Sequence, residues 1–173
     1  EIDIINARYI IPGKLIQIAY AQKYPSLIRY LFPDPVATAG WQVYAVQMLM
    51  GEGFGDWDDE YHILKLKEEV KVICLAFIEG QYYSGKMDRK KTVAYLRKQA
   101  FLNNKEAEES MVQTDLHLFA GTQAFVGMIE INYLLKEYNK YLGDKFSIIQ
   151  FHQEILESGI IPFNQLKKQV LSL

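Results

Sequence analysis

The sequence of 173 residues has few of the side chains that usually build disulfides or metal sites. It contains one cysteine, Cys74, and three histidines, His62, His117 and His152. One cysteine cannot form an intrachain disulfide, and its apolar neighbours at 72–76 predict a buried, unreactive thiol. None of the histidines is followed by a second one at metal-binding spacing, so the composition alone indicates no metal centre and no cofactor.

An excess of one charge and long hydrophobic runs are also lacking. Nineteen basic and 21 acidic residues give a net charge of -2, which offers no electrostatic basis for binding nucleic acid or an anionic membrane. No apolar run approaches the roughly 20 residues that span a bilayer, so we expect no transmembrane segment. The sequence opens at Glu1 without a basic and then apolar signal peptide. The compartment therefore stays unknown at this stage.

Hydrophobic residues, by contrast, make up 50% of the chain, which suffices for one domain with a substantial core. They recur at steps of three and four residues between short breaks that contain proline or glycine, a pattern typical of amphipathic helices. The apolar segment 2–11 fits either a strand or a helix. The predicted helices lie at about 15–22, 38–50, 59–78, 88–101, after 104, at 123–142, at 147–158 and after 162.

These short connections predict an all-α fold, an antiparallel helical assembly of about seven to eight helices with little room for a sheet. Thr38 is the predicted N-cap of the helix that follows it. Asn103 with Glu106, and Ser147 with Gln150, have the spacing of reciprocal capping boxes. Since no repeat or flexible linker occurs, we expect residues 1–173 to form a single domain or the C-terminal fragment of a larger helical domain.

Several segments combine backbone-breaking residues with aromatic ones. Residues 8–14 read Arg-Tyr-Ile-Ile-Pro-Gly-Lys, and residues 39–45 read Ala-Gly-Trp-Gln-Val-Tyr-Ala. Near the other end, residues 142–146 read Leu-Gly-Asp-Lys-Phe, followed by Phe-His at 151–152 and a Gly-x-x-Pro-x-x-x-Leu pattern at 159–166. In order and spacing, these segments resemble the bacterial domain-of-unknown-function family 885, whose members resemble helical zinc metallopeptidases. The resemblance implies a fold like the C-terminal part of a helical gluzincin-like peptidase domain.

The departures from that family fall on its reactive positions. Its members carry His-Glu-x-x-Pro-Gly-His, and the resemblance places Arg8 at the first histidine, Tyr9 at the glutamate and Lys14 at the last histidine. Ala39 stands where the family has the glutamate before Gly-Trp. In a middle segment of the family, Asp-Thr-Gly-Ile-His, Tyr82 takes the place of the histidine. Arginine and lysine present positive hydrogen-bond donors, whereas zinc needs neutral imidazole, carboxylate or thiolate ligands.

The resulting hypothesis is a catalytically inactive relative or fragment of a peptidase-like family, a pseudoenzyme with a binding or structural role. We expect it to have no catalytic residue, no metal ligand and no cofactor. Residues of a remnant cleft would be Arg8, Tyr9, Lys14, Ala39, Trp41, Tyr44 and Tyr82.

Two alternatives remain open at this point. The first is a metal-dependent peptidase or another hydrolase with relocated ligands, which requires Glu52, Glu79, His62 or His117 to converge. The second is a plain structural helix bundle, which is favoured if Trp41 and Tyr44 are wholly buried and no cavity remains.

The same resemblance makes a prediction about partners. The family's domain extends upstream of its Pro-Gly segment, so the chain should expose an apolar face. We expect that face to be covered by the missing upstream part of the same protein or by a second copy in a homo-oligomer. A peptide or small molecule is the expected ligand if the cleft is open, and nucleic acid is not expected.

Overall fold

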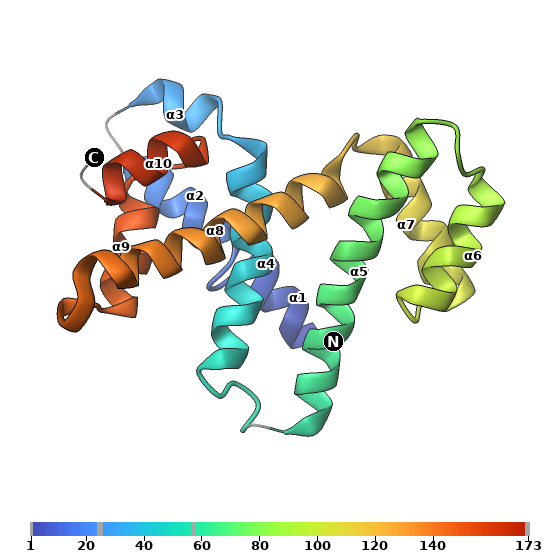
Figure 1. The fold of residues 1–173 in the computed structure, drawn as a ribbon, viewed down its shortest axis with the longest axis horizontal. Helices are drawn as coiled ribbons and strands as arrows, with labels where there is room; N and C mark the ends of the chain where they lie inside the picture. Colours follow the sequence, from blue (N-terminus) through green and yellow to red (C-terminus); the bar gives the residue numbers. More distant parts are fainter. Residues whose placement is uncertain (1, 24–25, 57, 172–173) are drawn as a thin grey trace. The chain divides into compact units, whose positions relative to one another are not determined.

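The computed structural model describes residues 2–23, 26–56 and 58–171. Within these ranges the regular secondary structure is entirely helical, which confirms the all-α prediction. The chain divides into two compact units (Figure 1). Glu1–Leu49 and Val126–Leu173 form what we call the discontinuous unit, and Met50–Phe125 form the continuous unit.

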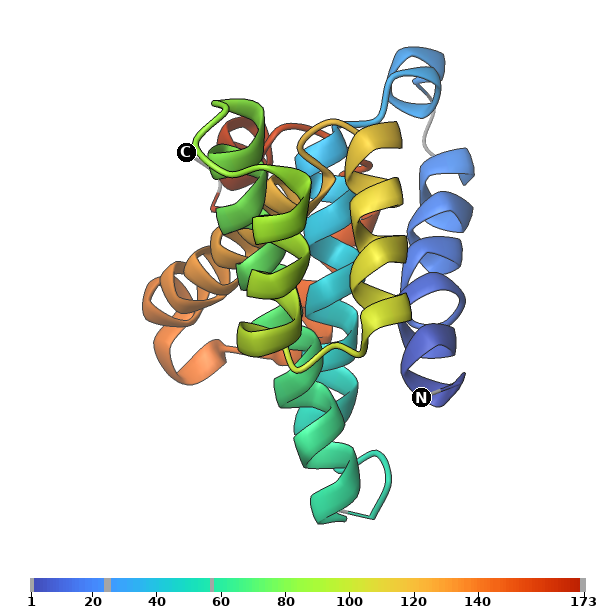
Figure 2. The same cartoon turned by 90° about the vertical axis from the view of Figure 1, so that its right-hand side faces the viewer.

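The discontinuous unit contains both ends of the chain. Figure 2 shows α1 and α2 following one another closely, joined by the short turn at residues 10–13. Most of α4 and most of α8 also belong to this unit. Its elements are α1 (Ile2–Tyr9), α2 (Lys14–Lys23), α3 (Leu27–Leu31), α4 (Pro35–Gly51), α8 (Ala120–Leu142), a 3-10 turn (Gly143–Lys145), α9 (Ile148–Glu157) and α10 (Phe163–Val170).

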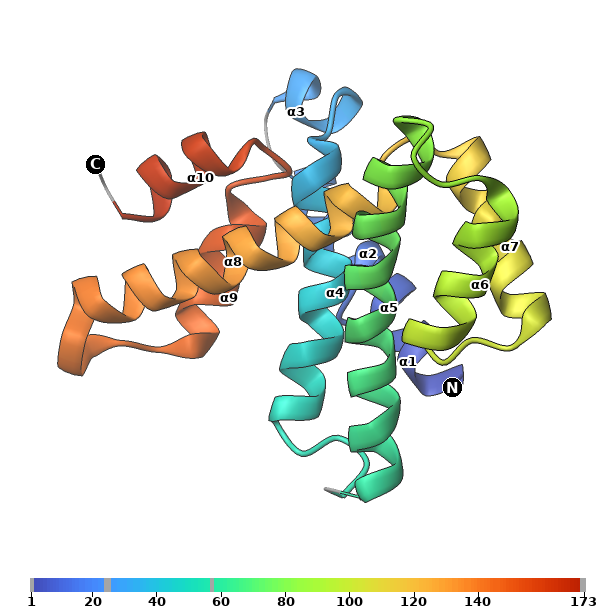
Figure 3. The ribbon, with the colours of Figure 1, turned by 45° about the vertical axis from the view of Figure 1, so that its right-hand side comes forward.

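The continuous unit is built from α5 (Asp59–Tyr83), α6 (Arg89–Gln99) and α7 (Asn104–Leu116), which lie side by side (Figure 3). Its core takes buried residues from all three helices, among them Ile78, Leu96 and Met111. Cys74 is buried in the same core, as its apolar neighbours predict. Burial raises the pKa of its thiol, which agrees with an unreactive side chain.

The helices begin at residues with local capping chemistry, but two of the predicted caps need correction. The capping box of Asn103 and Glu106 is present in both directions. At α9 only half of the predicted box forms, because the Gln150 side chain donates to Glu154 Oε1 at 2.9 Å instead of returning to the N-cap. The N-cap predicted at Thr38 is wrong. Asp34 precedes α4 and its Oδ1 accepts the Ala37 N–H at 2.7 Å, because proline suits the first position of a helix and aspartate the position before it.

Other corrections concern helix existence and length. The sequence did not decide whether the apolar segment 2–11 forms a strand or a helix, and the structure shows the helix α1 there. The short helix α3 was not predicted. Helix α5 continues to Tyr83 instead of ending near Ile78, so Gly80 lies inside it. Ile78 and Glu79 are both buried at that point. Their tertiary contacts outweigh the cost of about 1 kcal/mol that glycine brings to a helix.

Helices α4 and α8 cross at two glycines. A Cβ atom built on Gly127 would lie 2.2 Å from the Val36 carbonyl oxygen and 2.6 Å from Gly40 Cα. A Cβ on Gly40 would lie 2.4 Å from the Gly127 carbonyl carbon. The two backbones therefore touch directly, and this close approach brings the apolar residues of both helices into one core, including Trp41, Tyr44 and Ile131.

Tyr138, in the same core, gives this unit a pH dependence. Its hydroxyl donates to Glu154 Oε1 at 2.9 Å, and burial together with this carboxylate raises its pKa to about 12. An unfolded tyrosine ionises near pH 10. The stability contributed by Tyr138 is therefore complete below about pH 10 and is lost as the pH rises toward about 12.

As the pH rises from about 9 to 12, we expect the free energy of unfolding of the wild type to fall by about 2 kcal/mol more than that of the Tyr138→Phe variant. Urea denaturation followed by circular dichroism at several pH values measures this difference. Ionisation of the other tyrosines affects both proteins alike, so the variant serves as the reference. Identical pH profiles for the two proteins would contradict the assignment.

Candidate functional site

The turn between α1 and α2 holds the first predicted site residues. Arg8 lies in the last turn of α1, Tyr9 ends that helix with 51% of its surface exposed, and Lys14 begins α2 at the surface. Between them the Ile11–Pro12 peptide bond is cis. A Cβ on Gly13 would lie 1.9 Å from the Arg8 carbonyl oxygen. Glycine is therefore required here for space, which accounts for the glycine of the Pro-Gly pair.

Trp41 ties α4 to this turn. Its indole Nε1–H donates to the Pro12 carbonyl oxygen at 3.0 Å, and only 1% of its surface is exposed. Ala39, on the same helix, is half-buried. The structure thus brings the segments 8–14 and 39–45 into contact, and it does so through a side chain that fills the space between them.

Tyr44 continues the packed cluster one turn further along α4. Its hydroxyl lies 2.7 Å from His152 Nε2 of α9. The His152 ring also meets the edge of Trp41, with centroids 6.1 Å apart. Tyr44 is 4% exposed. A histidine held by a hydrogen bond and two aromatic rings acts as a packing element, as its position between apolar residues predicts.

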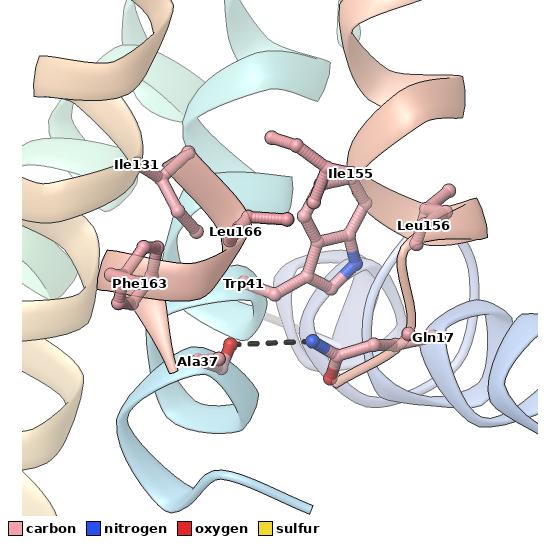
Figure 4. Close-up of a pocket in the computed structure, with 9 residues that line it drawn as sticks. Gln17, Ala37, Trp41, Ile131, Ile155, Leu156, Phe163 and Leu166 are labelled. Atoms are coloured by element: carbon pink, nitrogen blue, oxygen red, sulfur yellow. Dashed lines mark hydrogen bonds between the residues drawn. The ribbon is translucent and has the colours of Figure 1, made fainter. Parts of the chain in front are cut away.

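A cavity remains beside this cluster (Figure 4). It has a volume of about 10 Å³ and is lined mainly by apolar side chains, with Trp41 on one wall. Its polar member is Gln17 of α2, whose Nε2 donates to the Ala37 carbonyl oxygen at 3.2 Å. Gln17 Oε1 is buried without a hydrogen-bond partner in the described residues. The space is about that of one water molecule, far below that of an organic ligand.

Gln17 was missed by sequence reasoning. It lies on a short helix of mixed apolar and polar residues, 20 positions from the carbonyl that it contacts. No local signal distinguishes such a glutamine from a solvent-exposed one.

Tyr82, the remaining predicted site residue, belongs to the continuous unit. It packs against that unit's core and lies next to Tyr83, with ring centroids 5.8 Å apart. Tyr83 in turn donates its hydroxyl proton to the Thr114 carbonyl oxygen at 2.7 Å. The surroundings of Tyr82 are thus those of a packed aromatic residue.

Glu79 is the buried carboxylate among the residues considered for a relocated hydrolase site. It is 1% exposed and accepts three hydrogen bonds: from the Gly121 N–H at 2.8 Å, and from the Thr122 N–H and hydroxyl at 2.7 Å each. These donors form the start of α8, where the helix dipole favours a negative charge. Glu79 is therefore a helix cap supplied from a distant segment.

The other candidates for that alternative are Glu52, His62 and His117, and each of them is exposed. Across the described ranges, no three side chains from histidine, cysteine, aspartate and glutamate come together in a way that could hold a metal ion. The arrangement offers no support for a hydrolase with relocated ligands.

The described residues thus form an all-helical fold in which two glycines set the crossing of α4 and α8. The model of the family described as "Bacterial protein of unknown function (DUF885)" matches residues 7–170, so this chain belongs to that family. This agrees with the resemblance found in the sequence.

Solved structures of similar fold are known. One, titled as a "putative lipoprotein of unknown function" from Shewanella oneidensis, is 28% identical with a TM-score of 0.89, and the match covers 98% of this chain and 31% of that chain. Another, titled as the "putative lipoprotein" from Colwellia psychrerythraea, is 21% identical with a TM-score of 0.91, covers 96% and 29% respectively, and shows the fold alone. This chain therefore spans roughly a third of the length of these proteins. A search among curated proteins found no match.

No single helix among the described residues has both the length and the apolar character needed to cross a membrane.

Proposed function

We propose that this chain is a catalytically silent member of its family, with a binding or structural role in a larger protein or assembly. The observation that carries the proposal is the chemistry of the turn between α1 and α2. At the positions that the resemblance equates with the family's His-Glu-x-x-Pro-Gly-His, this turn presents Arg8, Tyr9 and Lys14. Two cationic side chains repel a divalent metal ion and offer it no lone pair. These residues do not fit zinc.

The packing around Trp41 supports the same proposal. The indole lies between the turn and the rest of α4, with its only hydrogen-bond donor bound to the Pro12 carbonyl oxygen. The adjoining cavity is large enough for about one water molecule. An active-site cleft needs open space for substrate next to its reactive groups, and a cavity of this size does not provide it.

The surface of α1 and of the following turn supports a structural role. Ile2, Ile5 and Ile11 are 74%, 55% and 62% exposed, and a row of exposed isoleucines is unfavourable in water unless something covers it. We propose that a further part of a longer protein covers this face, since the similar solved chains are about three times as long as this one. Association into a homo-oligomer is the competing explanation, and sedimentation of the longer protein and of this chain distinguishes the two.

The test of catalytic silence is zinc content together with peptide cleavage. We expect the purified chain to bind far less than one equivalent of zinc and to show no zinc-dependent hydrolysis of a mixed peptide library. The matched positive control restores the family residues in one variant: Arg8→His, Tyr9→Glu, Lys14→His and Ala39→Glu. If the correspondence of positions is right, this variant gains about one equivalent of zinc, because three or four donors then surround one point.

Stoichiometric zinc and zinc-dependent cleavage by the unaltered chain would overturn the proposal. Failure of a folded quadruple variant to gain zinc would overturn the correspondence of positions on which it rests. Circular dichroism and urea denaturation show whether that variant is folded.

A further inference from the structure

A second hollow lies on the discontinuous unit, on residues that differ from those of the turn between α1 and α2. It is an open groove of about 540 Å³ formed by α8, the start of α4 and the beginning of α10. Its accessible apolar wall includes Val36 of α4, Val126 of α8 and Phe163 of α10. This volume lies within the range of roughly 300–1,000 Å³ that is usual for ligand sites.

The charges of the residues that line the groove do not sum to zero. Asp34 and Glu130 line it with carboxylates, and Lys167 is its basic residue. Lys167 is already engaged, because its Nζ lies 2.5 Å from Glu137 Oε2 and 5.2 Å from the centroid of the Tyr133 ring. The bond to Glu137 raises the pKa of Lys167 and lowers that of Glu137, so this pair stays ionised and mutually neutralised.

Asp34 and Glu130 therefore set the charge of the groove. The Asp34 carboxylate accepts the Ala37 N–H at the start of α4, and a hydrogen bond of this kind leaves its negative charge in place. Among the described residues, Lys167 is bound by Glu137, and the charge of Glu130 contributes less than that of Glu137 to the raised pKa of Lys167. The groove thus combines an apolar wall with two negative charges, which is complementary to a ligand that has an apolar face and positive charges beside it.

The shape of the groove indicates which ligand this is. Its wall follows α8 from Val126 to Tyr133, a distance of about 10 Å, or two helical turns. Open grooves along a helix suit an amphipathic partner helix, which inserts apolar side chains at spacings of three and four residues. We propose that this groove binds an amphipathic basic helix, with its apolar face on Val36, Val126 and Phe163 and its basic side chains beside Asp34 and Glu130.

The experiment uses the whole chain and two synthetic peptides of about 15 residues, long enough for appreciable helicity. Both carry leucine at i, i+3, i+4 and i+7; the other positions are lysine in one and glutamate in its twin. Binding is followed by fluorescence anisotropy and by amide chemical shifts of the labelled protein. We expect the lysine peptide to bind and to shift the amides of residues 126–134 and 163–167, and the glutamate peptide not to bind.

Variants locate the binding. Glu130→Lys should weaken binding of the lysine peptide about three- to tenfold, because a solvent-exposed attraction becomes a repulsion. Glu157→Lys on α9 makes the same charge change outside the groove, where the carboxylate accepts a bond from Gln153, and should leave affinity within twofold. Asn164→Trp adds bulk at an exposed lining position and should weaken binding without a change of charge.

Equal binding of both peptides, equal loss in Glu130→Lys and Glu157→Lys, or no binding of the lysine peptide below about 1 mM would each overturn the proposal. Binding of octylammonium at this groove without binding of the peptide would overturn the assignment to a helix. Because the groove is separate from the turn between α1 and α2, failure here leaves the zinc and cleavage test of catalytic silence unaffected.

Discussion

The Gly127→Ala variant is expected to be destabilised by about 3 kcal/mol or more, although it adds a single methyl group. That methyl group would lie 2.2 Å from the Val36 carbonyl oxygen and 2.6 Å from Gly40 Cα. Both neighbours are backbone atoms, which cannot rotate away as a side chain would. Helices α4 and α8 would have to separate along their crossing, and the apolar contacts of Trp41 and Ile131 would loosen with them. Urea denaturation followed by circular dichroism measures the loss.

Gly80→Ala provides the matched control. Gly80 lies inside α5, and a Cβ built there has nothing within 4 Å. The same methyl group should therefore stabilise the protein by about 0.5–1 kcal/mol, since alanine favours a helix over glycine. If the two variants change stability by similar amounts, the glycine crossing does not hold α4 and α8 together.

The Glu79→Ala variant should lose about 3–5 kcal/mol, through a different mechanism. The substitution removes one buried carboxylate and leaves three donors at the start of α8 without a partner, namely two backbone N–H groups and the Thr122 hydroxyl. Each unsatisfied buried donor costs about 1–3 kcal/mol, although water that enters the vacated space recovers part of this. Faster hydrogen exchange at Gly121 and Thr122 should accompany the loss of stability.

Glu109→Ala is the control for this second substitution. Glu109 pairs with Lys105 at 3.8 Å on the surface of α7, and exposed pairs of this kind contribute at most about 0.5 kcal/mol. A loss of similar size for Glu79→Ala would show that its carboxylate is not a helix cap. Formate added to the Glu79→Ala protein should restore part of the stability, because a small carboxylate can occupy the same donors.

Local chemistry allowed the helices to be predicted where capping side chains decide their ends. The capping box of Asn103 and Glu106 confirms this. Predictions that ignored distant contacts were wrong. The helix predicted to end near residue 78 continues to Tyr83, because the burial of Ile78 outweighs the low helix propensity of Gly80.

At the candidate site, too, some features could be predicted from the sequence and others depend on distant contacts. The pairing of the Pro12-Gly13 turn with the segment of Trp41 rests on a family resemblance, and the two segments do meet through the indole. The role of Glu79 depends on a partner 42 residues further along the chain. No periodicity or motif connects these residues, so the sequence could not separate a helix cap from a catalytic acid.

The division of the chain into units also has a consequence for the order of folding during synthesis. The three helices of the continuous unit are consecutive, so the ribosome releases all their partners within one stretch of chain. Helix α4 is made earlier but has to wait for α8, which carries Gly127, before its Gly40 face is covered. Nascent chains that stop short of residue 126 therefore expose that face, and chaperones that bind apolar segments would meet it there.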